Sequence, residues 1–292
     1  GGNLIFPWYV GASCVLYAGP PRQAAAVLKA ISTFKPTVFV SVPTIYSAIL
    51  SLPNFYKRFD IGSLRMCISA GEPLPLQTWN TWRDATEIEI LDTIGCTETY
   101  HTFMANRPGE VRPGSSGKPI RGYDVRLVDD EGKDVQAGMI GNLMVRGEST
   151  ALFYLHQSEK TRHSFRGEWL FTGDQYLQDK DGYYWHKGRV DDMLKVGGLW
   201  VSPMEIEEVL SGHDSVADSA VVGHYDNAGL LKPKAFVCLR NGVEPSDELF
   251  EQLVKLCAKT LDAHKRPRWL EFNNDLPRTS TGKLQRFKLR EQ

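Results

Sequence analysis

Apolar runs and amphipathic segments alternate along the first third of the chain. Residues 24–34 and 75–85 favour helices, and Pro43 lies where a further helix can begin. Buried strands are favoured by the apolar runs at 37–42, 64–70 and 88–93. Such alternation predicts a parallel sheet with covering helices, in which ligands bind in the loops at the carboxyl ends of the strands.

The start of the chain is also apolar (NLIFPWYVGASCVLY, 3–17), and we predict that it forms strands. Gly1 and Gly2 stand where an initiator methionine would be, and there is no signal peptide. We therefore interpret the sequence as a fragment that begins inside a domain.

The pattern changes near Arg107, after which Gly, Pro and short strands dominate (YDVRLVDD, GNLMVRG, EWLFTGD, DGYYWHKGR). This is typical of a small, mainly antiparallel β unit. The pattern changes again after Asp191. We predict a helix at 202–212, with Ser202 as its N-cap and Pro203 at its first position. Two strands (VADSAVVG, PKAFVCLR), a helix at 246–261 and a last strand (RWLEF) would complete a small α+β domain.

The expected organisation is a partial α/β domain (1–106), a β-rich subdomain of that domain (107–190) and a mobile C-terminal α+β domain (191–292). Apolar residues make up 42% of the chain and charged residues 24%, as in an ordinary soluble protein. The net charge of −1 and the lack of a long apolar run argue against nucleic-acid and membrane partners. Five scattered cysteines without a CxxC pair favour a reducing, cytoplasmic location over a disulfide framework.

Two polar loops follow predicted strands. The small residues of SAGEPLP (69–75) let a backbone approach a flat ligand, although a plain strand-to-helix turn explains them equally well. In DTIGCTET (92–99), Asp92 can accept from an exocyclic amine and Thr97 can bond a phosphate oxygen. Glu98 suits Mg²⁺ held on nucleotide phosphates. The alternative is a capped turn in which Asp92 or Thr97 bonds backbone groups.

Later polar segments add further candidates. Asp174 of LFTGD can accept from the two hydroxyls of a ribose, and Arg189 of KGRVDD adds a donor fork, although a turn aspartate and a surface arginine are the simpler explanations. Gly197 and Gly198 would let the backbone turn sharply or line a narrow tunnel. An ordinary linker with a hairpin turn explains the two glycines equally well. Lys283 follows a Thr-Gly pair near the C-terminus, where a solvated lysine on a turn is the usual explanation.

In this order and spacing, SAGEPLP, IGCTE, TGD, GRVDDMLKVGG and PRTSTGK resemble the successive signatures of the acyl-adenylate-forming superfamily. The resemblance covers essentially the whole chain. RPGEVRPGSSGKPI, the histidine of TETYH and DDMLKVGGLWVSPMEIE look most similar to the benzoate–CoA ligase branch. The resemblance implies a large α/β domain followed by a small α+β lid domain. It also implies ATP, Mg²⁺ and coenzyme A in a two-step reaction, in which a carboxylate forms an acyl-adenylate and the thiol of coenzyme A then displaces AMP.

The resemblance also implies roles for individual residues. Thr97 would touch phosphate, Glu98 would bind Mg²⁺, and Asp174 and Arg189 would hold the ribose. The residues implied to flank the adenine are Gly71, Glu72, Pro73, Asp92 and Thr93.

Three further positions match residues that the family uses as hinge, tunnel lining and catalytic lysine. Asp191 would be the hinge of the C-terminal domain, and Gly198 would line the pantetheine tunnel. Lys283 would bridge the substrate carboxylate and the α-phosphate, where its positive charge stabilises the transition state. A lysine on a mobile domain could be present for adenylation and absent when coenzyme A enters.

The expected substrate is a small aromatic carboxylic acid such as benzoate. Gly95 would leave the acyl pocket open, and His101 resembles the histidine that aryl ligases place near the ring and carboxylate. A core or loop histidine is the alternative for His101. A medium-chain acyl-CoA synthetase and a non-catalytic nucleotide-binding module are the alternative functions. The superfamily's phosphate loop would precede residue 1, and Trp200 stands where many relatives carry a basic residue.

Overall fold

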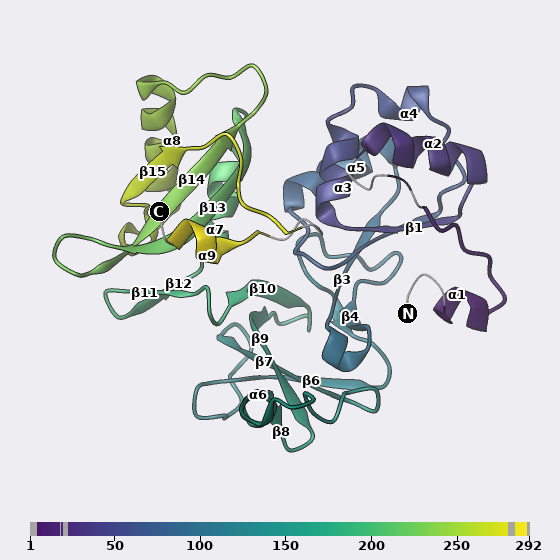
Figure 1. Ribbon diagram of the computed structural model, residues 1–292, viewed down its shortest axis with the longest axis horizontal. Helices are drawn as coiled ribbons and strands as arrows, with labels where there is room; N and C mark the ends of the chain where they lie inside the picture. The colour runs from purple at the N-terminus through teal and green to yellow at the C-terminus, as the bar shows by residue number, and fades with distance from the viewer. Residues whose placement is uncertain (1–4, 18, 20–22, 280–283, 291–292) are drawn as a thin grey trace. The chain divides into compact units, whose positions relative to one another are not determined.

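The computed structural model describes residues 5–17, 19, 23–279 and 284–290. Contacts divide the chain into two compact units, Gly1–His186 and Lys187–Gln292, whose elements are labelled in Figure 1. In the described part, each helix is too short or too polar to cross a membrane.

The first sheet of unit 1 has the strand order β1-β2-β3-β4-β5. Three parallel strands, β1 (Val38–Ser41), β2 (Met66–Ser69) and β3 (Ile90–Gly95), are followed by two antiparallel strands, β4 (Thr102–Ala105) and β5 (Lys118–Pro119). Helix α2 (Ala24–Phe34) precedes β1, and the helices between the parallel strands are α3 (Pro43–Leu50), α4 (Phe55–Arg58) and α5 (Leu76–Thr86). One cluster joins these helices to the strands, with Leu28, Tyr46 and Trp82 buried against Cys67 and Ile90.

The second sheet of unit 1 has the order β10-β9-β7-β6, and β8 also pairs with β9. Its strands are β6 (Tyr123–Val128), β7 (Ile140–Gly147), β8 (Phe165–Arg166), β9 (Trp169–Gln178) and β10 (Tyr184–Arg189). The short helix η1 (Thr97–Thr99) joins β3 to β4, and α6 (Ser158–Ser164) precedes β8. Phe103, Leu143, Leu170 and Tyr176 form the buried cluster that ties β4 to this antiparallel sheet.

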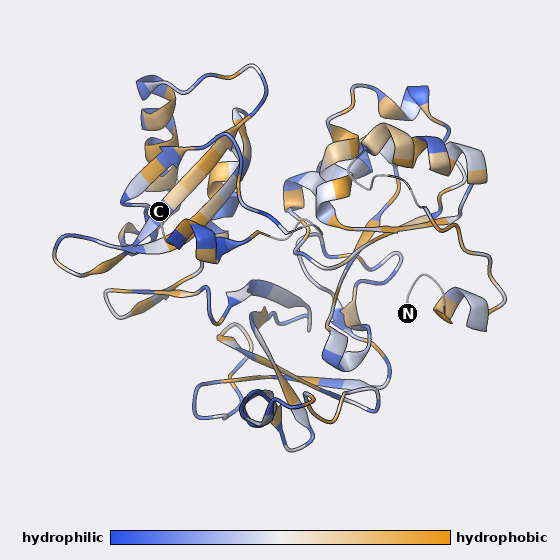
Figure 2. Cartoon of the chain, in the orientation of Figure 1, coloured by the Kyte–Doolittle hydropathy of each residue, from blue (hydrophilic) through white to orange (hydrophobic). Residues whose placement is uncertain are grey.

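Unit 2 is an α+β fold with its own core. A hairpin of β11 (Leu194–Val196) and β12 (Leu199–Val201) is followed by a sheet of β13 (Val216–Tyr225), β14 (Leu231–Leu239) and β15 (Trp269–Phe272). Its helices are α7 (Pro203–Ser211), α8 (Asp247–Thr260), η2 (Ala263–Lys265) and α9 (Arg286–Arg290). The apolar length of β14, visible in Figure 2, is buried between residues such as Ile206 and Leu253 on one face and Leu276 and Leu289 on the other.

The strand predicted for the start of the chain is wrong in its described part. Residues Ile5–Tyr9 form the short helix α1, and residues 12–17 lie in no strand. The Ala12 N–H donates to the Pro7 carbonyl at 2.8 Å, and Trp8 is 61% exposed. A strand needs a neighbour to satisfy its backbone groups. No described strand pairs with this stretch, so local turns take those hydrogen bonds instead.

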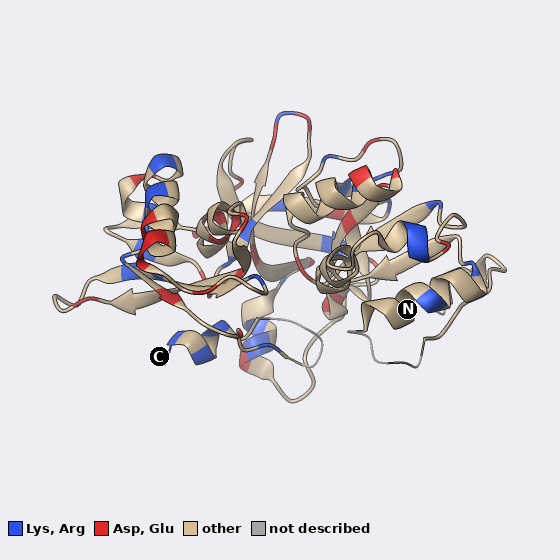
Figure 3. Ribbon diagram, turned by 90° about the horizontal axis from the view of Figure 1, so that it is seen from above, with Lys and Arg blue, Asp and Glu red and all other residues tan. Residues whose placement is uncertain are grey.

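The N-cap predicted for the helix at 202–212 is partly correct. Ser202 occupies the N-cap position of α7, but its hydroxyl donates to the Lys187 carbonyl instead of capping the helix. Ser246 does cap α8, since its side chain accepts from the Leu249 N–H. Basic and acidic residues are interspersed over both units (Figure 3), and exposed ion pairs such as Lys35–Asp60, Arg146–Asp124 and Lys255–Glu251 contribute little to stability.

Candidate active site

The carboxyl ends of β2 and β3 bring together polar residues that are far apart in the sequence. Ser69 at the end of β2 is the register partner of Asp92 in β3, and the Thr93 hydroxyl donates to the Ser69 carbonyl at 3.1 Å. The loop after β2 carries Glu72, whose Oε2 accepts from the Thr44 hydroxyl at 3.2 Å. Parallel pairing of β2 and β3 therefore places the two predicted polar loops on adjacent strand ends, as expected.

Within the part of the chain that the structure describes, three buried oxygens at this edge lack a hydrogen-bond partner: Ser69 Oγ, Glu72 Oε1 and Asp92 Oδ1. Burial raises the pKa of Asp92 well above its ordinary value, and the main-chain N–H groups of Leu74 and Thr93 only partly offset this effect. Buried polar atoms are normally paired, so an unpaired group points to a missing partner. A flat ligand with amine donors fits this edge, and Gly71 (φ +92°) beside it leaves the backbone open to close approach.

The turn between β3 and β4 carries the candidate phosphate and metal residues. Thr97 opens the short helix η1 and is exposed, whereas Thr99 is buried. The Glu98 carboxylate accepts a hydrogen bond from the Tyr154 hydroxyl at 2.5 Å, and the Glu98 carbonyl accepts from the Ala151 N–H at 2.6 Å. Residues around 149–154 thus hold both the main chain and the side chain of Glu98.

The charge of Glu98 suits a divalent cation. Burial raises its pKa, but hydrogen bonds from Tyr154, from its own main-chain N–H and from Cys96 outweigh burial and lower the pKa below the ordinary value. The described residues contain no group of three or more His, Cys, Asp or Glu side chains that could enclose a metal ion. Mg²⁺ bound to nucleotide phosphates needs only one or two protein carboxylates, because phosphate oxygens and waters complete its shell. Glu98 fits that requirement.

The fold requires glycine at position 95 for a reason that the sequence does not reveal. A Cβ atom at this position would lie 2.2 Å from the His101 carbonyl oxygen and 2.7 Å from Thr102 Cα. These are main-chain atoms of β4 and the turn before it, beside a bulge in the β3–β4 pairing between Ile94 and Gly95. The close approach of two backbones therefore requires glycine here, whatever the acyl pocket needs.

His101 follows η1 and is half-buried. Its ring packs edge-on against Phe6 at a centroid distance of 5.1 Å. Burial is the main cause of a pKa below the ordinary histidine value, which favours the neutral imidazole. A neutral imidazole can both donate and accept a hydrogen bond.

The two residues expected to hold a ribose, Asp174 and Arg189, come from strands β9 and β10. Asp174 is in β9, and its Oδ1 lies 3.6 Å from His186 Nε2 in β10. Arg189 ends β10 and is exposed; it belongs to unit 2, whereas Asp174 belongs to unit 1.

In unit 2, Gly198 lies in the two-residue loop of the β11–β12 hairpin. Gly197 (φ +59°) and Gly198 (φ +86°) both have left-handed backbones, as a type I′ hairpin turn requires. Gly198 borders an open pocket of about 390 Å³ that two lysines, Lys195 and Lys232, also line. Lys283, the predicted catalytic lysine, lies outside the described residues.

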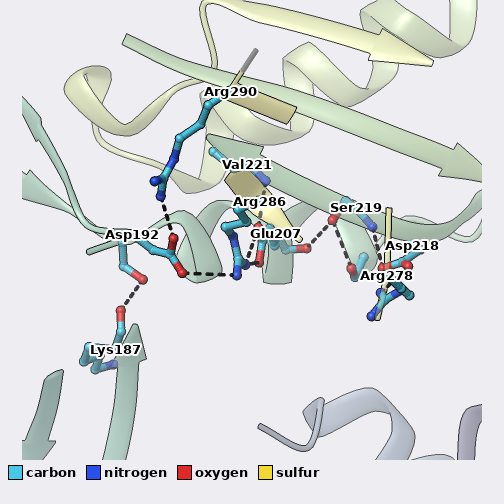
Figure 4. Close-up of polar contacts among 11 residues, drawn as sticks. Lys187, Asp192, Glu207, Asp218, Ser219, Val221, Arg278, Arg286 and Arg290 are labelled. Carbon is cyan, nitrogen blue, oxygen red and sulfur yellow. Dashed lines mark hydrogen bonds and ion pairs between the residues drawn. The ribbon is translucent and has the colours of Figure 1, made fainter. Parts of the chain in front are cut away.

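Asp191, the predicted hinge residue, is exposed and lies in the turn that follows β10. Its carbonyl accepts from Arg290 Nη2 at 3.1 Å, and the same guanidinium pairs with the Asp192 carboxylate at 2.6 Å. Asp192 also lies 3.6 Å from Arg286 Nη1, and Arg286 makes two hydrogen bonds to the Glu207 carboxylate (Figure 4). Helix α9 therefore fixes the turn that contains Asp191 to helix α7.

Comparisons with known proteins show the family of the chain. The AMP-binding enzyme family matches residues 2–155, and the AMP-binding enzyme C-terminal domain matches residues 205–283. The chain belongs to the AMP-binding enzyme family, and the resemblance drawn from the motifs is confirmed. The predicted fold class, a large α/β domain followed by a small α+β domain, is confirmed as well.

Individual relatives refine the comparison. The chain is 45% identical over 291 residues to a benzoate–CoA ligase of Thauera aromatica, covering 99% of this chain and 55% of that protein. It matches the crystal structure of the anthranilate CoA ligase AuaEII in complex with anthranoyl-AMP with a TM-score of 0.95 and 57% identity, covering 100% of this chain and 56% of that one. A benzoate CoA ligase structure from Burkholderia xenovorans LB400 matches with a TM-score of 0.91 and 44% identity, covering 99% and 57%. The chain thus spans about half the length of the relatives it matches.

Several residues that hold the site together are not predictable from the sequence. Tyr154 and Ser149 bind η1 from about 50 residues away, and Arg286 and Arg290 bind the hinge turn from the other end of unit 2. None of these four residues lies within the motifs that carry the resemblance. Only the hydrogen bonds that form in the folded chain reveal their role.

Proposed function

We propose that this chain is part of an ATP-dependent acid–thiol ligase that activates an aromatic carboxylic acid as an acyl-adenylate and transfers it to coenzyme A. The observation that carries the proposal is the pair of adjacent strand ends. Together these ends carry three buried oxygens, of Ser69, Glu72 and Asp92, that have no hydrogen-bond partner among the described residues, and the turn after β3 carries the fixed carboxylate of Glu98. The three oxygens suit a nucleotide base with amine donors, and the Glu98 carboxylate suits Mg²⁺ bound to phosphates.

In the first half-reaction, a carboxylate oxygen attacks the α-phosphate and pyrophosphate leaves. Asp92 accepts from the adenine amine, while Gly71, Glu72, Pro73 and Thr93 border the base. Thr97 donates to a phosphate oxygen. Glu98 would hold Mg²⁺, whose charge offsets that of the phosphates.

The remaining roles concern the ribose and the second half-reaction. Asp174 and Arg189 bind the ribose hydroxyls, and Lys283 neutralises the negative charge that develops at the α-phosphate. Rotation about Asp191 then changes the face that unit 2 presents, and Gly198 borders the path of the pantetheine. The thiolate of coenzyme A attacks the acyl carbonyl, and AMP leaves.

An aromatic acid is the proposed substrate class. The names of the relatives mention benzoate and anthranilate, and the half-buried, neutral His101 next to Phe6 offers a polar group beside an aromatic one. A medium-chain acyl-CoA synthetase is the alternative, because a single methylene is worth only about 1–3 kcal/mol in an apolar pocket. A reducing, cytoplasmic location forms part of the proposal, with Cys67, Cys238 and Cys257 present as buried free thiols.

The test is a substrate panel with the full-length protein that carries this chain. Pyrophosphate release and coenzyme A consumption are measured with benzoate, 4-hydroxybenzoate, 2-aminobenzoate, cyclohexanecarboxylate, hexanoate and octanoate. We expect the highest kcat/KM with an aromatic acid and loss of pyrophosphate release in Lys283→Ala. A highest kcat/KM for octanoate would reject the aromatic substrate. Absence of pyrophosphate release with every acid would reject the reaction itself.

A further inference from the structure

The turn that carries Glu98 is held by a segment about 50 residues further along the chain. The Ser149 hydroxyl donates to the Thr99 carbonyl at 2.9 Å, and the Ala151 N–H donates to the Glu98 carbonyl at 2.6 Å. The Tyr154 hydroxyl donates to Glu98 Oε1 at 2.5 Å. Of these three bonds, only that of Tyr154 reaches the carboxylate.

The Tyr154 ring is itself fixed in place. It packs edge-on against Phe165 with a centroid distance of 5.4 Å, and Lys160 Nζ lies 3.9 Å from its centroid on the ring face. The Tyr154 main-chain N–H donates to the Thr161 hydroxyl at 3.0 Å. Because Thr161 holds the main chain of Tyr154 and Phe165 and Lys160 contact its ring, the hydroxyl points in one direction, toward Glu98.

We propose that Tyr154 is a positioning residue that holds one oxygen of Glu98 and so directs the other oxygen to the divalent cation. This inference rests on the proposed function, since it assumes that Glu98 is the metal ligand. Mg²⁺ demands near-octahedral geometry, and a carboxylate whose one oxygen accepts from a phenol binds the ion through the other. Outer partners of metal ligands typically change metal affinity about 10–100-fold when removed.

The variant that tests this is Tyr154→Phe, which removes the hydroxyl and keeps the ring between Phe165 and Lys160. Tyr183→Phe is the matched control. Tyr183 also has a lysine on its ring face, with Lys118 Nζ at 4.4 Å, but its hydroxyl donates to the Glu110 carbonyl at 2.9 Å. Both variants lose one partly buried phenol hydrogen bond in unit 1, and only one of the two bonds involves Glu98.

The experiment uses the full-length protein and two readouts. Binding of Mn²⁺ in the presence of ATP is titrated by electron paramagnetic resonance, and the Mg²⁺ dependence of pyrophosphate release is measured with benzoate. We expect Tyr154→Phe to weaken Mn²⁺ binding and raise the Mg²⁺ requirement by about 10-fold or more, with most of the rate restored at saturating Mg²⁺. Tyr183→Phe should leave both values at those of the wild type. Cation affinity that is unchanged in Tyr154→Phe would overturn the inference.

A double-mutant cycle separates positioning from a general loss of structure. In a Glu98→Gln background the Tyr154→Phe change should weaken Mn²⁺ binding no further, because the tyrosine acts through the carboxylate. Additive losses in the double variant would show that Tyr154 acts elsewhere and would reject the inference. A wild-type protein that binds Mn²⁺ with ATP but adenylates no acid would instead contradict the proposed function alone.

Discussion

Substitution of Gly95 by alanine is expected to destabilise unit 1, since the new Cβ atom has no room. It would lie 2.2 Å from the His101 carbonyl oxygen, 2.6 Å from the His101 carbonyl carbon and 2.7 Å from Thr102 Cα. All three atoms belong to the main chain, so no side chain can rotate away to relieve the clash. One of the two paired strands must move.

The magnitude follows from this geometry. Inserting a methyl group into a well-packed site typically costs about 1–3 kcal/mol, and a clash with main-chain atoms places Gly95→Ala at the upper end, about 3 kcal/mol. Unit 1 extends from Gly1 to His186, a size class in which 1 kcal/mol shifts Tm by about 2–4 °C. The expected loss is therefore about 6–12 °C in the melting temperature of unit 1.

Differential scanning calorimetry of the chain measures this loss, with Gly62→Ala as the control. The nearest atom to a Cβ at Gly62 is the flexible Asp60 Oδ1 at 3.4 Å, so alanine fits there. If Gly95→Ala melts within about 1 °C of Gly62→Ala, the backbone clash is not what requires glycine. A stable variant with altered acid preference would instead support the view that Gly95 matters only for the width of the acyl pocket.

Two further predictions concern buried charges. Burial raises the folded-state pKa of Asp92, so the wild type loses stability as pH rises from the ordinary carboxyl range toward this raised pKa. The Tm of Asp92→Asn minus that of the wild type should therefore increase between about pH 4 and pH 8. A constant Tm difference across this range would contradict the prediction. Arg286→Met should cost unit 2 about 3–5 kcal/mol in urea unfolding because it leaves the largely buried Glu207 carboxylate with the Val221 N–H but without its positive partner. Arg290→Met, at a 38% exposed arginine, should cost under about 1 kcal/mol. Equal losses in the two arginine variants would mean that Glu207 is not held by Arg286.

Local periodicity predicted most of the regular elements. The helix expected at 24–34 is observed as Ala24–Phe34, because one face carries the buried residues Ala24, Val27, Leu28 and Ile31. The parallel strands were also located to within two residues at each end. These elements are specified by their own side chains, which face a single apolar core. The stretch at 5–17 could not be predicted this way, since an apolar run becomes a strand only beside another strand.

The candidate site was predictable where its residues are close in sequence. Asp92, Thr97 and Glu98 occur in one short segment of sequence, and the parallel sheet brings Glu72 to the adjacent strand end. Tyr154 was not predictable, because its bond to Glu98 crosses 56 residues and leaves no local pattern. The individual roles of these residues in binding ATP, Mg²⁺ and coenzyme A stay predictions.

Each unit buries its own apolar side chains. Among the described residues, two clusters draw only on unit 1 and two only on unit 2, with members such as Trp82 and Leu143 in the first pair and Ile206 and Phe236 in the second. A crossover between genes near residue 186 would therefore leave every one of these clusters whole. Selection could then exchange the C-terminal unit between relatives without rebuilding either interior. In such an exchange, any preference for the acid that Gly95 and His101 confer would be inherited with the first unit, separately from the lysine loop.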